Sequence, residues 1–160
     1  MKKHLLCLIS LCICLLFTSC AAVKYRSDIP CSDIAKALSA EISGTESYAR
    51  YGEDELSFML EDSSVYDDCC FLYSRSSDDI SEIAVLRSSS DTDALLLSIN
   101  AYAATQIKEK RSFIENYLPA EFQKLEGCEA RIFGEYVIFV MLNEVDKKVV
   151  FDEAERILKG

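Results

Sequence analysis

Histidine is nearly absent from this chain, which has 160 residues and a single histidine, His4. Tryptophan is missing altogether, and there are only five glycines and two prolines. His4 lies in a segment that we expect to be removed, so the remaining chain has no imidazole. That absence excludes Ser-His-Asp and Cys-His catalysis, histidine-ligated metal sites and imidazole proton shuttles.

Basic residues are scarce relative to acidic ones. From Cys20 onward, 141 residues contain 15 Lys and Arg against 27 Asp and Glu. Nucleic acids and anionic membrane surfaces are both bound by clustered Lys and Arg. We therefore expect no nucleic-acid partner and no electrostatic membrane patch. The length fits one domain, which buries roughly two thirds of its unfolded surface.

The first nineteen residues have the pattern of an export signal. Lys2 and Lys3 form a short basic region, and within residues 5–17 only Ser10 is polar. At about 1.5 Å per residue this apolar stretch is roughly 20 Å long, shorter than the ~30 Å hydrocarbon core. We predict a signal peptide over residues 1–19 rather than a membrane-spanning helix.

Residues 16–20, LFTSC, resemble a bacterial lipobox, although Phe17 stands where that pattern usually has leucine. The resemblance implies that Cys20 becomes the mature N-terminus and carries a thioether-linked diacylglycerol. The alternative is an ordinary secretory signal in which Cys20 is accidental. Each buried lipid CH₂ contributes about 0.8 kcal/mol, so the lipid chains hold the protein on the extracytoplasmic face of the bacterial cell membrane. Residues 20–30 are then a tether of about 35 Å at most, with little reason to fold.

Hydrophobic spacing predicts one α+β domain over residues 31–160. We expect helices over residues 32–44, 53–61, 88–117 and 119–125, and a last helix that begins at Asp146. We expect strands over residues 65–74, 80–87, 128–133 and 136–142. Ser32 or Asp33 is the expected N-cap of the first helix, and the longest helix has an apolar stripe from Leu96 to Tyr117. Two ββα units after a first helix indicate a single four-stranded, mainly antiparallel sheet packed with helices, in the order α-β-β-α-β-β-α. Residues 136–142 are apolar on both faces, which predicts a central, covered strand.

Several short segments carry a resemblance to a known family. Residues 82–87 close a strand before a capped helix, residues 117–121 lead into residues 124–126, and residues 134–137 open the last strand. In this order and spacing they resemble the DUF4358 family of small Firmicutes lipoproteins, over roughly residues 32–158. The resemblance implies a lipid-anchored protein with a single domain. It supplies no catalytic motif.

Four cysteines remain after Cys20: Cys31, Cys69, Cys70 and Cys128. Export permits disulfides, and four cysteines allow three full pairings. Cys69 and Cys70 are adjacent in a predicted strand, so they project to opposite faces, and no Cys-x-x-Cys is present. We expect packed thiols; one disulfide or a metal or redox site are the alternatives.

Other polar and aromatic groups have both a structural and a chemical interpretation. The acidic pairs at residues 67–68, 78–79 and 91/93 suit Ca²⁺, but caps and turns explain them better. Seven serines lie between Ser74 and Ser90, without a catalytic motif or an activating histidine. Four tyrosines are candidates for a recognition surface, although a core or rim position is more common for such residues: Tyr48, Tyr51, Tyr66 and Tyr73.

Three functions remain open. The leading one is a membrane-anchored, non-catalytic interaction or accessory protein with an envelope protein as its partner. The second is a module that binds a small ligand or cell-wall component between helices and sheet. The third is an enzyme that uses carboxylates or a thiol. We expect no enzymatic activity, no cofactor and no metal. A concave polar pocket with perturbed carboxylates favours the second or third, and an exposed apolar sheet face favours the first.

Overall fold

The computed structural model describes residues 23–60 and 62–159. The predicted signal peptide and Cys20 lie outside the described residues. The helices are α2 (Cys31–Ala40), α3 (Glu53–Met59), α4 (Thr92–Tyr117), α5 (Phe122–Glu126) and α6 (Glu144–Leu158), with short 3₁₀ turns η1 (Thr45–Ser47), η2 (Ser63–Val65) and η3 (Pro119–Glu121). The strands are β1 (Tyr48–Arg50), β2 (Tyr66–Ser74), β3 (Glu82–Ser88), β4 (Glu129–Phe133) and β5 (Tyr136–Met141). No helix of this part of the chain is long and apolar enough to cross a membrane.

The fold is α+β, with one antiparallel sheet in the strand order β1-β2-β3-β5-β4. The predicted count of four strands is wrong, because the described residues form five. The added strand, β1, has three residues and pairs only with Leu72–Ser74 of β2. So short a segment has no alternation of its own, and its pairing with β2 makes it a strand. Consequently the predicted order α-β-β-α-β-β-α lacks β1, and it also leaves out the short helices α3 and α5.

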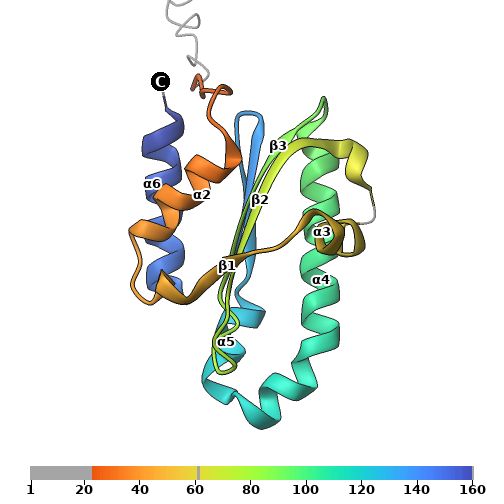
Figure 1. Cartoon of the computed structure of the whole chain (residues 1–160), viewed down its shortest axis with the longest axis vertical. Coiled ribbons are helices and arrows are strands. Elements are labelled where there is room, and N and C mark those ends of the chain that lie inside the picture. The colour runs from red at the N-terminus through yellow and green to blue at the C-terminus, as the bar shows by residue number, and fades with distance from the viewer. Residues whose placement is uncertain (1–22, 61, 160) are drawn as a thin grey trace, which may run out of the picture.

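Two hydrophobic layers enclose the sheet. On one face, α2 and α6 cover a cluster that includes Ile83, Val85 and Val140. On the other face, α3 and α4 cover a cluster that includes Phe71 and Phe139. Figure 1 shows the sheet between these two pairs of helices. All of β5 is buried between β3 and β4, so the prediction of a central strand covered on both faces is confirmed.

Helix starts depend partly on distant residues. Asp91 caps α4 as expected, with its carboxylate accepting from the backbone N–H groups of Asp93 and Ala94 at 3.0 and 3.1 Å. The first helix, however, begins at Cys31, whose N–H donates to the carboxylate of Asp68 at 2.8 Å. The predicted caps Ser32 and Asp33 are therefore wrong.

Two other predictions about the helices need correction. The last helix begins at Glu144 after an Asn143 cap, two residues before Asp146. In α4, the fully buried positions are Leu95, Ile99, Tyr102 and Ile114 rather than the whole predicted stripe. Tyr117 is 72% exposed because it lies in the last turn of the helix.

The end of the expected tether packs against the domain. Tyr25 and Lys159 form an isolated antiparallel β-bridge through their backbones, and the backbone N–H of Arg26 donates to the carbonyl of Leu158 at 2.8 Å. The hydroxyl of Tyr136 donates to the carbonyl of Ile29 at 2.7 Å and accepts from its N–H at 3.1 Å. From Tyr25 onward, the expectation of an unfolded tether is therefore wrong.

Candidate functional site

A groove of about 740 Å³ lies along the first half of β2. We call it the β2 groove, and it is lined by Arg50, Tyr51, Gly52, Leu56, Ser57, Ser63, Tyr66, Asp67, Asp68 and Cys69. β1 ends at Arg50, and the chain then turns at Gly52 into α3. Since β2 continues well beyond its pairing with β1, the short β1 leaves room for this groove.

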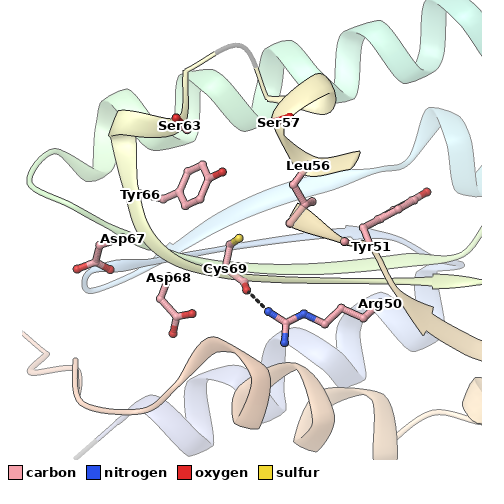
Figure 2. A pocket seen from close by; sticks show the side chains of 10 residues that line it. Arg50, Tyr51, Leu56, Ser57, Ser63, Tyr66, Asp67, Asp68 and Cys69 are labelled. Atoms are coloured by element: carbon pink, nitrogen blue, oxygen red, sulfur yellow. Dashed lines mark hydrogen bonds between the residues drawn. The ribbon is translucent and has the colours of Figure 1, made fainter. Parts of the chain in front are cut away.

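Charged and aromatic side chains enter the groove from different sides. Figure 2 shows Tyr66 and Leu56 on the side of α3, and Arg50 and Asp68 on the side of α2. The Arg50 guanidinium donates to the carbonyl of Cys69 at 3.0 Å. Leu56 is almost fully buried and holds α3 against the core. The groove thus combines a guanidinium, carboxylates, hydroxyls and aromatic rings on a fixed frame.

Both groove aspartates have structural partners. Asp67 pairs with Arg87 at 2.8 Å, and Asp68 caps α2 through the N–H of Cys31. A carboxylate next to a helix N-terminus satisfies a backbone donor and complements the helix dipole. These two carboxylates therefore shape the groove and give it negative charge.

A smaller cavity of about 280 Å³, which we call the Glu82 cavity, lies on the other side of Tyr51. It is lined by Tyr51, Tyr73, Ser74, Ser76, Ser77, Asp79, Ile80, Ser81, Glu82, Lys110, Phe113, Ile114 and Leu118. The rings of Tyr51 and Tyr73 stack with centroids 4.1 Å apart and an interplanar angle of 20°. Tyr51 lines both cavities.

The four tyrosines named as candidates for a recognition surface do not form one surface. Tyr51 and Tyr73 stack, and Tyr51 and Tyr66 line the β2 groove. Tyr48 instead packs against the cluster under α2 and α6. The alternation of side chains along β1 places Tyr48 on the opposite face of the sheet from Tyr73.

Glu82 is the residue that sequence reasoning missed. Its side chain is 2% exposed, and the Tyr102 hydroxyl donates to both of its carboxylate oxygens, at 2.7 and 2.9 Å. Burial raises the pKa of Glu82 to about 7, although the Tyr102 hydrogen bond and the charge of Lys110 act in the opposite direction. The one signal in the sequence was a glutamate directly before the apolar residues IAVL of β3, and a glutamate at the start of a strand is more simply interpreted as an exposed strand end.

No protein-family model, curated protein or solved structure matches this chain. Functional conclusions therefore depend on the chain's own cavities, charges and surfaces.

Lys124 is the ion-pair partner of Asp79, the second residue of the acidic pair at residues 78–79. Its ammonium contacts Asp79 at 2.8 Å and Glu121 at 2.7 Å, and it donates to the Ser81 hydroxyl at 3.1 Å. Burial raises the pKa of Asp79, but the hydrogen bonds from Lys124 and Ser81 outweigh it and bring that pKa to about 2. This cluster connects the β2–β3 turn to η3 and α5.

Among the described residues, no group of three acidic, cysteine or histidine side chains is placed to hold a metal ion.

The cysteines are placed as packing residues. Cys69 and Cys70 contact opposite core clusters, as predicted for neighbours in a strand. Cys31 and Cys70 are buried thiols, and Cys128 is a partly buried one. Burial raises the pKa of each of these three. They are therefore protonated at neutral pH, whereas a nucleophilic or metal-binding cysteine is a thiolate.

Proposed function

We propose that this chain is a lipid-anchored, non-catalytic binding protein of the bacterial cell envelope, and that the β2 groove takes a component of the cell wall. The observation that carries the proposal is the groove itself, concave and lined by both polar and aromatic side chains. Ligand sites typically combine apolar walls with a few polar groups that fix orientation. The apolar N-terminal segment and the lipobox-like residues 16–20 support the extracytoplasmic location.

The covered sheet favours ligand binding over docking through the sheet. Helices α2 and α6 lie on one face, and α3 and α4 lie on the other (Figure 1). Within the described residues, no apolar sheet face is left for a partner. The groove is the larger of the two cavities at this edge of the sheet.

The groove's chemistry suits an uncharged, polyhydroxylated ligand such as a sugar of the cell wall. The rings of Tyr51 and Tyr66 offer apolar surface with a polar end. Arg50 donates hydrogen bonds, while Asp67 and Asp68 accept them. The net charge of −10 repels polyanions such as nucleic acids.

A non-catalytic role of the groove agrees with the state of the buried thiols and of the two groove carboxylates. The thiols of Cys31, Cys70 and Cys128 are held protonated by burial. In the groove, Asp67 is paired with Arg87 and Asp68 caps α2. Neither carboxylate is therefore left to act as a general base or nucleophile.

Binding of soluble glycan fragments from digested cell wall to the purified full chain tests the proposal. Ser57→Trp fills the groove from the exposed face of α3, and Arg50→Ala removes its guanidinium. Each should weaken binding at least about tenfold, the loss of roughly 1.4 kcal/mol. Ala104→Trp, at an exposed position on α4 outside the groove, is the matched control because it adds the same indole without changing the charge. Equal binding by all four proteins, or no binding to the wild type, contradicts the proposal.

One observation favours a second function, that of an interaction protein. Phe58 is 90% exposed and Leu97 is 70% exposed, and both line a hollow of about 400 Å³ between α3 and α4. Exposed apolar side chains gathered around a hollow are typical of protein–protein contact sites. Crosslinking from native membranes, compared between the wild type and Phe58→Glu/Leu97→Glu, tests this. A partner captured equally by both proteins excludes this surface.

A further inference from the structure

The Glu82 cavity has a charge arrangement that the proposed function does not use. Glu82 from β3 and Lys110 from α4 both line it. The stacked rings of Tyr51 and Tyr73 form part of its wall, and Phe113 of α4, which is 55% exposed, forms another part. An acidic residue, a basic residue and aromatic rings therefore line one small cavity.

The Glu82 carboxylate is short of hydrogen-bond donors. A carboxylate has about four acceptor positions on its two oxygens. Here one hydroxyl, that of Tyr102, serves both oxygens, and no ion pair in the described part of the chain includes Glu82. A buried carboxylate with a single neutral donor is costly to ionise, which gives a cationic ligand group a strong reason to bind there.

We propose that the Glu82 cavity binds a small zwitterionic amine, an α-amino acid or the like, with its ammonium at Glu82 and its carboxylate at Lys110. The ligand ammonium donates charge-assisted hydrogen bonds to the acceptor positions of the Glu82 carboxylate that the Tyr102 hydroxyl does not occupy. An ammonium on an outer face of the Tyr51–Tyr73 stack gains a cation–π attraction, which grows when water is excluded. Phe113, Ile114 and Leu118 give an apolar side chain of the ligand a surface to cover.

Ligand binding should depend on pH through Glu82. The groups that face it are Tyr102 and Lys110 of α4, Tyr51 before α3, and Cys128 before β4. Of these, Tyr51, Tyr102 and Cys128 have raised pKa values and stay neutral, so between pH 6 and pH 7 the titrating group is Glu82. Its pKa of about 7 means that it is mostly protonated at pH 6. Because the ammonium needs the carboxylate, affinity should rise about fivefold from pH 6 to pH 7.

Calorimetric titration of the purified full chain with L-phenylalanine is the test. L-phenylalaninamide lacks the carboxylate, and 3-phenylpropionate lacks the ammonium, so each should bind at least about tenfold more weakly. A dipeptide that begins with phenylalanine tests whether the site takes a free amino acid or the N-terminus of a peptide. Its ammonium is the same as that of phenylalanine, but its carboxylate lies one residue farther away. If the dipeptide binds as tightly as phenylalanine, the role of Lys110 is overturned.

Variants of single residues test whether binding depends on the Glu82 cavity rather than on the stability of the fold. Glu82→Gln keeps the shape of the side chain and should abolish both the binding of phenylalanine and its pH dependence. Phe113→Ala removes an exposed wall, cannot disturb the core, and should weaken binding about threefold. Glu135→Gln, an exposed carboxylate in the β4–β5 turn, is the control. The proposal is overturned if phenylalanine does not bind, or if it binds Phe113→Ala and wild type alike with no pH dependence. Ser57→Trp in the β2 groove should leave this binding unchanged, so the two proposals fail separately.

Discussion

The hydroxyl of Tyr102 donates to both carboxylate oxygens of Glu82, at 2.7 and 2.9 Å, in the core between α4 and β3. The Tyr102 ring also packs edge-on against Phe71 and Phe139, with centroids 5.9 and 5.6 Å away. The Tyr102 side chain therefore makes both a buried polar contact, through its hydroxyl, and apolar contacts, through its ring. Because this pair holds the longest helix on the sheet, the ionisation of Glu82 should be visible in the stability of the whole domain.

Stability should fall as pH rises from 5 to 8, and Glu82→Gln should remove this slope. The pKa of Glu82 moves from 4.5 to about 7 on folding, so the folded state binds a proton that the unfolded state has released. The stabilisation is complete below about 4.5 and is lost as pH passes through about 7, a change of roughly 3 kcal/mol. Urea unfolding midpoints at several pH values measure it.

Asp79 provides the internal contrast for that experiment. Its pKa is lowered to about 2, so its contribution is present above pH 4 and is lost only in acid. Asp79→Asn should therefore lower stability at every pH from 5 to 8 without changing the slope. A wild type and a Glu82→Gln variant with parallel pH profiles in this range would falsify the assigned ionisation of Glu82.

Gly134→Ala should detach the segment that begins at Tyr25. Gly134 has a φ of +64°, and a Cβ added there would lie 2.6 Å from the Cβ of Tyr25. The left-handed backbone costs a non-glycine residue about 1–2 kcal/mol, and the clash must also be relieved. Hydrogen exchange at the N–H of Arg26 should become faster, because its bond to Leu158 is lost. Glu135→Ala, the next residue in the same turn, should leave that exchange unchanged; equal effects of both variants contradict the contact.

Phe139→Ala should cost about 3 to 5 kcal/mol of unfolding free energy. Phe139 is fully buried in β5 and contacts the Tyr102 ring. Ile132→Ala, on the outer strand β4 and partly exposed, should cost far less. Chemical denaturation of both variants gives the comparison, and similar losses at the two positions refute the central placement of β5.

Cys20→Ser should block lipidation and leave the precursor unprocessed. The lipobox resemblance makes Cys20 the acceptor of the diacylglycerol, and serine has no thiol for the thioether. Mass spectrometry of the wild type and membrane fractionation of the variant measure the effect. A variant that stays membrane-bound at the mature size, with no acyl mass on the wild type, shows that the lipoprotein prediction is wrong.

The sequence by itself determined the elements whose pattern is local. The strands β2 to β5 and the helix α4 follow from side-chain periodicity within each segment. Asp91 caps α4 through its near neighbours, and Gly134 supplies the positive φ of a two-residue turn, so both were predictable. The burial of residues 136–142 followed from an apolar run on both faces of one strand.

Only the tertiary structure decided what depends on residues far apart in the chain. β1 is a strand because it pairs with β2, and α2 begins at Cys31 because Asp68, thirty-seven positions away, accepts its N–H. Glu82 became a candidate site residue for the same reason. Its neighbours Tyr102 and Tyr51 come from other elements, and burial by α4 shifts its pKa. Local periodicity encodes which way a side chain faces, whereas its partners and its exposure to water depend on how the elements pack together.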